Sequence, residues 1–257
     1  MKSPRLLAAL AAVALASATP FAQTQAPPPA LTQQQQNDEI LKELRAIRQL
    51  LERLTTVSPQ QQGAPPPEPT TAKVTNLKGY VLGKPDAPLT MIEFTDLQCP
   101  FCRQFSLSSF EEIKKNWIDT GKLRYISRDF PLDFHAQAMP AARAARCAGE
   151  QGKFWDMRMS LMKNAHLLTS EYISKTATDL KLDMRPFTAC SVSSKYDAEI
   201  QAEIQEGTRL GVGGTPTFVM GKTTAAAVEG PMLVGALPYA QFDAKLKEVL
   251  ASGPAVK

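Results

Sequence analysis

Short apolar segments alternate with amphipathic stretches between residues 73 and 257. Leu89–Phe94 is an apolar-rich run typical of a buried strand, and Leu123–Phe130 alternates apolar and polar positions as a half-buried strand does. Two further strands are predicted at Thr217–Gly221 and Met232–Leu237. This part of the chain is therefore expected to contain a β-sheet.

Helical periodicity fills the gaps between these strands. Apolar positions recur at helical spacing from Pro100 to about Trp117, across a long block at about 133–211, and in Tyr239–Ser252. The order is strand, helix, strand, helical block, two strands and helix. This is the order of a thioredoxin fold with a helical insertion, so we expect an α/β domain of that class over residues 73–257.

A separate amphipathic segment precedes this domain. Within Asn37–Leu54 the apolar positions recur at spacings of four and three residues: Ile40, Leu44, Ile47, Leu51 and Leu54. This heptad pattern is typical of a coiled coil and predicts a helix over residues 32–55. A single helix of this length is marginally stable in water, so it needs a partner surface. We expect a homo-oligomer, a trimer or so, through residues 37–54, because leucine at a and isoleucine at d favour trimers or tetramers. Folding back onto the chain's own domain is the alternative.

The segments on either side of this helix lack such periodicity. Residues 56–72 are rich in Pro, Gln and Thr and predict a semi-rigid linker. At the amino terminus, Lys2 and Arg5 precede the apolar run Leu6–Ala16, which is too short to span a bilayer. We expect residues 1–22 to be a cleaved signal peptide, an uncleaved anchor being the alternative. The mature protein is then periplasmic or secreted, where disulfides persist.

Charge excludes one class of partner. The formal net charge is +4, and it falls to +2 when Lys2 and Arg5 are removed with the signal peptide. So weak a charge gives no electrostatic basis for nucleic-acid binding.

Two cysteines, Cys99 and Cys102, are the strongest chemical signal. Their CPFC sequence joins a predicted buried strand to a predicted helix. Amide donors and the helix dipole at a helix N-terminus stabilise a thiolate, so the pKa of Cys99 should lie below that of a free cysteine. Cys99 is then the attacking sulfur and Cys102 the resolving one. An inert structural disulfide is an alternative. A zinc site is disfavoured because the chain's two histidines do not stand at ligand spacing, so we expect no metal ion and no cofactor.

A second signal is the sequence GVGGTPTFVMG, in which Pro216 follows Thr215 just before a predicted strand. Proline there cannot donate to a strand ladder and often marks a cis peptide bond at a tight turn. A cis Thr215–Pro216 bond would let extended backbone face the cysteine pair and hydrogen-bond with an incoming peptide. An ordinary trans proline at the start of a strand is the alternative.

Three separated motifs together resemble the DsbA-like branch of the thioredoxin superfamily, which includes suppressor-of-copper-sensitivity proteins. They are MIEFTDLQCPFCRQF, RDFPLDFHAQAMPAARAARCAGEQGKFWDM and LGVGGTPTF, and the resemblance extends from Asn76 to the end of the chain. It implies a secreted or periplasmic thiol-disulfide oxidoreductase with Cys99 and Cys102 as its redox-active pair and Pro216, preceded by Thr215, as its cis-proline. It also implies client proteins with thiols or disulfides, and a membrane redox partner that recycles the pair.

The resemblance also gives Glu93 a role. In relatives a buried acid at this place accepts protons from the inner cysteine, and burial in an apolar setting would raise the pKa of such a carboxyl. A strand-end glutamate that reaches solvent is the alternative. Asp96 is interpreted as a turn or cap residue before the helix, and His135 as a structural residue near the start of the insert.

The remaining cysteines, Cys147 and Cys190, fall in the predicted helical insert. With the CPFC pair accounted for, they are left to pair with each other in a structural disulfide, and some relatives carry such an extra bond. Two buried free thiols are the alternative.

The direction of catalysis stays open at this level. The CPFC sequence and the overall pattern fit an oxidase, whereas Thr215 before the proline and the oligomerisation helix favour an isomerase or reductase. A hypothesis of another class is a copper-handling protein that binds Cu(I) at the same cysteine pair, although the sequence has no Met- or His-rich tract to support it.

Overall fold

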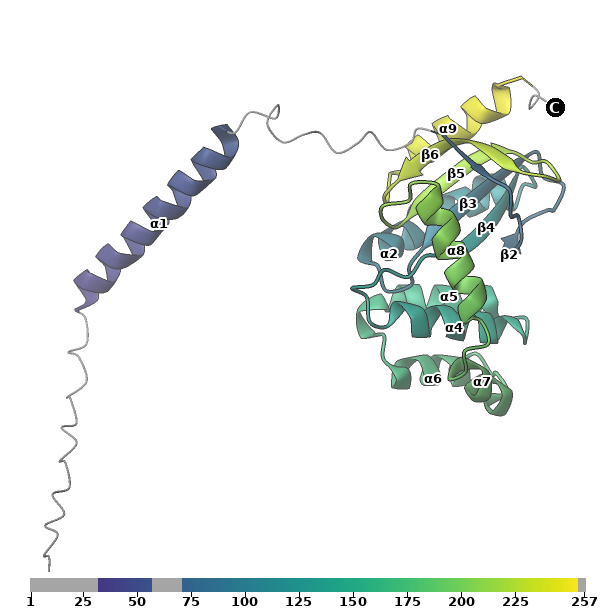
Figure 1. The fold of residues 1–257 in the computed structure, drawn as a ribbon, viewed down its shortest axis with the longest axis horizontal. Coiled ribbons are helices and arrows are strands. Elements are labelled where there is room, and N and C mark those ends of the chain that lie inside the picture. Colours follow the sequence, from purple (N-terminus) through teal and green to yellow (C-terminus); the bar gives the residue numbers. More distant parts are fainter. Residues whose placement is uncertain (1–31, 57–70, 254–257) are drawn as a thin grey trace, which may run out of the picture. The chain divides into compact units, whose positions relative to one another are not determined.

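The computed structural model describes residues 32–56 and 71–253, the latter forming one folded domain (Figure 1). The predicted signal peptide (1–22) and most of the predicted linker (57–70) lie outside the described residues. The chain divides into two compact units, with the boundary between Ala64 and Pro65. No helix within the described ranges is both long enough and apolar enough to cross a membrane.

Helix α1 (Gln33–Thr56) belongs to the first unit. It begins with a capping box: Gln35 N–H donates to Thr32 Oγ1, and the Thr32 N–H donates back to Gln35 Oε1. The large apolar side chains described on this helix are all about half exposed: Ile40, Leu44 and Ile47 of the heptad pattern, and Leu41 beside them. The helix therefore carries an apolar stripe that the described part of its own unit does not cover.

The second unit is built on a six-stranded sheet with the strand order β1-β6-β5-β3-β4-β2. Its strands are β1 (Thr71–Val74), β2 (Tyr80–Leu82), β3 (Leu89–Thr95), β4 (Leu123–Asp129), β5 (Thr217–Lys222) and β6 (Val228–Val234). Strands β3 and β4 are parallel and the other neighbouring pairs are antiparallel. All seven residues of β3 are buried, as its apolar sequence predicts.

The crossover from β3 to β4 is helical, as a parallel pair requires. It was predicted as one helix from Pro100 to about Trp117, but the structure divides it. Helix α2 (Pro100–Leu107) ends at Ser108, which has φ −128° and ψ −90°, and α3 (Ser109–Ile113) then continues into a π-helical turn, η1 (Lys114–Ile118). The break lets both Phe105 and Phe110 bury their rings in one aromatic cluster against the sheet.

The insert between β4 and β5 consists of helices α4 (Ala138–Gly149), α5 (Phe154–Lys163), α6 (Ser170–Asp179), α7 (Met184–Ser191) and α8 (Asp197–Arg209), with a 3₁₀ turn η2 (Ala165–Leu167). Figure 1 shows α4 and α5 near the sheet, with α6 and α7 beyond them. The closing helix α9 (Tyr239–Ala251) packs against the aromatic cluster through Phe242.

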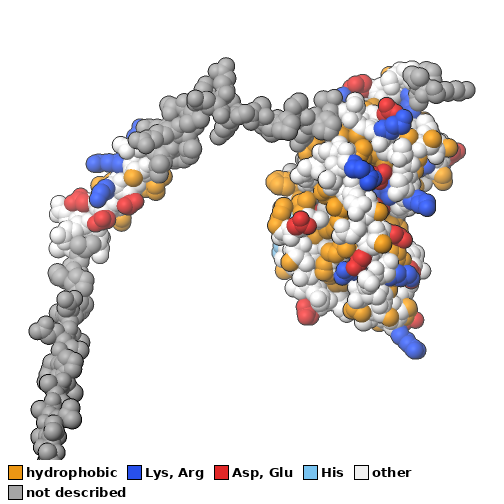
Figure 2. All heavy atoms as spheres, viewed as in Figure 1, with side chains coloured by type: hydrophobic (Ala, Val, Ile, Leu, Met, Phe, Trp, Pro, Cys, Tyr) orange, Lys and Arg blue, Asp and Glu red, His pale blue; other side chains and the backbone are white. Residues whose placement is uncertain are grey.

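Buried ion pairs fix the insert to the sheet. Arg146 of α4 donates to Asp129 of β4 and to Glu203 of α8, each at 2.6 Å, and Arg128 of β4 donates to Glu203 at 2.9 Å. All four side chains are at least nine-tenths buried. Because removing one partner would leave an uncompensated buried charge, these pairs specify how the insert sits on the sheet. On the surface, Lys and Arg side chains lie among Asp and Glu side chains on the face seen in Figure 2.

Three strands differ from the sequence expectation. Strand β6 spans Val228–Val234, whereas the prediction placed it at Met232–Leu237. Gly235, at φ +90°, ends the strand, and its N–H donates to the Pro216 carbonyl. The short edge strands β1 and β2 were not predicted, and β1 starts at residue 71, inside the segment interpreted as linker.

Candidate active site

Cys99 is placed by the junction between β3 and α2. It is the N-cap residue of α2 with extended backbone, φ −68° and ψ 126°, and Pro100 follows at the first helical position. Its carbonyl accepts the first helical hydrogen bond, from the Arg103 N–H at 3.0 Å. Both Cys99 and Cys102 carry free thiols, and both pack in the apolar core that the insert helices form.

The two thiols have very different acidities. The pKa of Cys99 is lowered to about 6, first by a hydrogen bond from the Cys102 thiol and further by Thr215 and by backbone N–H groups of α2, against the opposing effect of burial. Burial raises the pKa of Cys102 well above its usual value, and its hydrogen bond to Cys99 and the charge of Glu93 raise it further. One thiol is thus ready to attack, and the other holds its proton.

The loop before β5 faces Cys99. The Thr215–Pro216 peptide bond is cis, and the Cys99 Sγ atom lies 3.4 Å from the Thr215 carbonyl oxygen. The Thr215 side chain is buried, and its hydroxyl has no hydrogen-bond partner among the described residues. The loop therefore presents backbone beside the sulfur, on the far side of the thiol from α2.

Glu93 of β3 lies behind Cys102 and is fully buried, so it does not reach solvent. The setting is not apolar, contrary to the expectation. Arg158 of α5 approaches Glu93 Oε2 to 2.5 Å, and the Tyr125 hydroxyl donates to the same oxygen. The second carboxylate oxygen, Oε1, is buried and has no partner within the described residues. Glu93 thus has one oxygen committed to the insert and one unpartnered.

Arg158 is a site residue that the sequence analysis missed. It is buried on α5 among apolar residues of the same helix face: Phe154, Met157, Leu161 and Met162. Burial lowers the pKa of its guanidinium, but the charges of Glu93 and Tyr125 outweigh this and raise it. An arginine at a helical position of an otherwise apolar stripe is a signal visible in the sequence. The sequence does not show that its partner is Glu93, which lies 65 residues earlier.

Asp96 organises the turn before α2, as its turn or cap interpretation expected. Its carboxylate accepts from Gln98 N at 2.7 Å and Leu132 N at 2.9 Å, and His135 Nδ1 lies 2.7 Å from Oδ2. Its own N–H is 3.5 Å from Cys102 Sγ. The sequence analysis did not connect Asp96 with His135, which are 39 residues apart.

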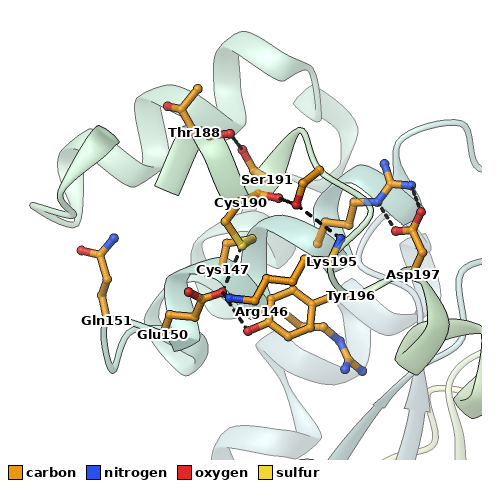
Figure 3. The surroundings of a disulfide bond; sticks show 12 residues. Arg146, Cys147, Glu150, Gln151, Thr188, Cys190, Ser191, Lys195, Tyr196 and Asp197 are labelled. Carbon is orange, nitrogen blue, oxygen red and sulfur yellow. Dashed lines mark hydrogen bonds and ion pairs between the residues drawn. A yellow bond between two sulfur atoms is a disulfide. The ribbon is translucent and has the colours of Figure 1, made fainter. Parts of the chain in front are cut away.

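Cys147 and Cys190 are joined by a disulfide between α4 and α7, with the two Cα atoms 5.8 Å apart (Figure 3). Glu150 Oε1 lies 3.1 Å from Cys190 Sγ and accepts from Lys195 Nζ and Tyr196 OH, both at 2.9 Å. Cys147, Glu150 and Cys190 form the only candidate metal-binding group of three or more among the described residues, and the disulfide occupies both of its sulfur atoms. Among the described residues, no third His, Cys, Asp or Glu side chain joins Cys99 and Cys102 in such a group.

The family model described as thioredoxin matches residues 75–232. The chain belongs to the thioredoxin family. Among curated proteins, this thioredoxin-family chain is 32% identical over 180 residues to the Na(+)/H(+) antiporter NhaA 1 of Mycolicibacterium gilvum. That match covers 67% of the chain but 29% of the antiporter, so the chain spans less than a third of the curated relatives' length.

Solved structures of DsbA-like proteins share this fold. Alpha-DsbA1 from Wolbachia pipientis has a TM-score of 0.61 at 23% identity, covering 68% of this chain and 92% of the other. BdbD from Bacillus subtilis has a TM-score of 0.60 at 21% identity, and the match covers 71% of this chain and 99% of BdbD. The catalytic domain of Proteus mirabilis ScsC has a TM-score of 0.55 at 23% identity, and the match covers 67% of this chain and 89% of that domain. The predicted thioredoxin fold with a helical insertion is thus confirmed, and the family model confirms the thioredoxin family.

Proposed function

We propose that this protein is a thiol-disulfide oxidoreductase that exchanges disulfides with client proteins through Cys99 and Cys102. The observation that carries this proposal is the Cys99 thiol at the start of α2, facing the cis Thr215–Pro216 loop, with a pKa of about 6 beside a Cys102 thiol of raised pKa. This combination supplies a nucleophile, a resolving thiol and a backbone surface in one place.

In the oxidising direction, a client thiolate attacks Sγ of Cys99 in the Cys99–Cys102 disulfide. The S–S bond breaks, and Cys102 leaves with the electron pair and takes up a proton. A second client thiolate then attacks the client sulfur of the mixed disulfide and releases Cys99 as a thiolate. The low pKa of Cys99 makes it a good leaving group in this step and stabilises the reduced protein. Reduction of a client runs through the same steps in reverse.

The residues around the pair have distinct parts in this scheme. The cis-proline loop, through Thr215 and Pro216, pairs with extended client backbone next to Cys99. Glu93 serves the inner thiol, and its unpartnered Oε1 is the atom that exchanges the Cys102 proton. Both Cys102 and Glu93 are fully buried although the two thiols are free, so neither group is in contact with bulk solvent.

Location and partners follow from the same proposal. The Cys147–Cys190 disulfide fits a periplasmic or secreted protein, because such bonds persist in oxidising compartments. A membrane redox partner would reset the CPFC pair. The exposed apolar stripe of α1 would join several chains, a trimer or so, and so gather several CPFC sites around one client.

The deciding experiment compares two chains in two assays. The mature chain, and a chain that starts at Thr70 so that β1 is kept whole, are each given scrambled-disulfide ribonuclease and reduced ribonuclease. If the mature chain unscrambles and the shorter chain only oxidises, α1 makes an isomerase of an oxidase-like domain. If both only oxidise, the protein is an oxidase. If a Cys99→Ser/Cys102→Ser variant matches the wild type in both assays, the proposed function is wrong.

A further inference from the structure

A groove of about 500 Å³ lies at the start of α2. Gln98 and Pro100, the neighbours of Cys99 in the chain, both line it, together with Arg103, His135, Ala165 and His166. The lining therefore comes from the start of α2, from the loop before α4 and from the η2 turn of the insert. A larger cavity of about 610 Å³, between β1, β6 and the end of α9, contains none of the active-site residues.

The ionisable lining of this groove is basic. Arg103 and both histidines of the chain face it, and no acidic residue lines it. Asp96, behind His135, already binds two backbone N–H groups and the histidine. Other ionisable groups nearby in the chain are Lys163, at the end of α5, and Asp133, two residues before His135; both are exposed and neither lines the groove.

Arg103 is positioned but unpaired. Its Nε donates to the Lys163 carbonyl oxygen at 3.0 Å, which holds the guanidinium against the end of α5. Its two terminal nitrogens have no hydrogen-bond or ion-pair partner among the described residues. A guanidinium held in this way presents a fork of donors that matches a carboxylate.

Three exposed apolar side chains adjoin the lining residues in the chain, and together they are called the apolar rim. Phe101 is 59% exposed, Phe134 78% and Leu167 50%. Each of these residues is a chain neighbour of a lining residue, and the Phe134 ring also contacts the His135 ring, with centroids 4.6 Å apart. Exposed apolar side chains around a cleft are typical of a surface that binds another polypeptide.

We propose that this groove binds an acidic side chain of the client, close in sequence to the cysteine that exchanges with Cys99, and that Arg103 is the specificity-determining residue. This rests on the proposed function, since the client is brought there by the exchange at Cys99. The apolar rim contacts the client on either side of its acidic residue, while the cis-proline loop holds the client backbone on the other side of the sulfur.

The test uses the mature chain and short peptides with one disulfide that differ at a single position. Glu, Gln or Lys is placed in turn at the two positions before and the two after the reactive cysteine, and kcat/KM is measured for each peptide. At one of these positions we expect Glu to exceed Gln by about two- to fivefold, the size of a partly exposed ion pair, and Lys to fall below Gln. The preference should shrink at high salt.

Three variants locate the preference. Arg103→Gln should abolish the difference in kcat/KM between the Glu and Gln peptides, and Arg103→Lys should retain part of it. Arg185→Gln, the same change at an exposed arginine of α7, should behave like the wild type. Equal rates on Glu and Gln peptides at every position would overturn the acidic specificity alone. Equal loss on all peptides in Arg103→Gln would show a structural role instead. No turnover of any peptide would contradict the proposed function itself.

Discussion

Arg158 and Glu93 form a buried ion pair that joins the helical insert to the central strand directly behind Cys102, with Nη2 and Oε2 2.5 Å apart. The arginine side chain is 1% exposed and the glutamate side chain is fully buried. The carboxylate whose charge raises the pKa of Cys102 is therefore held by the insert, so the insert is part of the active site as well as a cover for it.

Arg158→Met should destabilise the protein by about 3–5 kcal/mol, because it leaves the Glu93 charge buried without its partner. Urea unfolding of the oxidised protein measures this. The double variant Glu93→Gln/Arg158→Met should recover part of the loss, since neither charge then remains. Arg185→Met, at an exposed site, should change the free energy of unfolding by less than about 0.5 kcal/mol. A double variant no more stable than the single one would contradict the pairing.

Ionisation of Cys99 should be visible in two pH profiles. The alkylation rate of the reduced protein should rise through a midpoint near pH 6, because the thiolate is the nucleophile. Because the folded pKa lies below the ordinary value of 9.0, the ionised thiol stabilises the reduced protein at high pH, and this contribution is lost as the pH falls through about 6.

Between pH 6 and 9, the melting temperature of the reduced protein should therefore increase relative to that of the oxidised protein, which has no free thiol to ionise. Cys102 adds no slope in this window because its raised pKa keeps it protonated. An alkylation midpoint near 9 would show that Cys99 is an ordinary thiol.

Thr215→Val should raise the pKa of Cys99 modestly. The substitution keeps the shape of the side chain and the carbonyl beside Cys99 Sγ. It removes the Thr215 hydroxyl, which has no partner beside the protonated thiol but lowers the pKa of Cys99 as a donor to the thiolate. The alkylation midpoint should move upward by less than it does in Cys102→Ala, because the hydrogen bond from the Cys102 thiol is the largest contributor. An unchanged midpoint in Thr215→Val would assign the whole effect to Cys102 and the α2 backbone.

The sequence predicted the elements that hold the thiols, because their signals are local. Strand β3 is a run of buried residues, and the CPFC motif stands where a strand meets a helix. The cis Thr215–Pro216 bond was also foreseeable, although only beside these other motifs. Each of these features depends on residues that are close together in the chain, so the sequence pattern predicts it.

Features that depend on distant neighbours were missed. Strands β1 and β2 are only four and three residues long, and each is defined by pairing with a strand far along the chain. Glu93 was expected in an apolar setting because its partner, Arg158, lies in the insert, and the sequence does not show that the two residues meet. The sequence shows that Arg158 falls on the apolar face of its helix, but it does not show which buried acid compensates the charge.

Replacing Cys147 and Cys190 together by alanine should cost about 4 kcal/mol, the loop-closure value for a separation of 43 residues. The loss should appear in urea unfolding of protein whose CPFC pair is kept reduced in both samples by a mild reductant that leaves the buried Cys147–Cys190 bond intact. The midpoint of Cys99 alkylation should stay near 6, because neither cysteine is among the groups that set the Cys99 pKa. A shifted midpoint would make this disulfide a regulator of the active pair.

Light scattering on the mature chain should give the mass of a trimer or tetramer, and the variant Leu44→Glu/Ile47→Glu should give a monomer. Both side chains are about half exposed on the apolar stripe of α1, and glutamate keeps the helix propensity while placing charge in the seam. The control is Ala46→Glu/Gln49→Glu, which adds the same charge at exposed positions outside the stripe and should remain oligomeric. If the mature chain is already a monomer, the coiled-coil interpretation is wrong. In that case any isomerase activity belongs to the single catalytic domain.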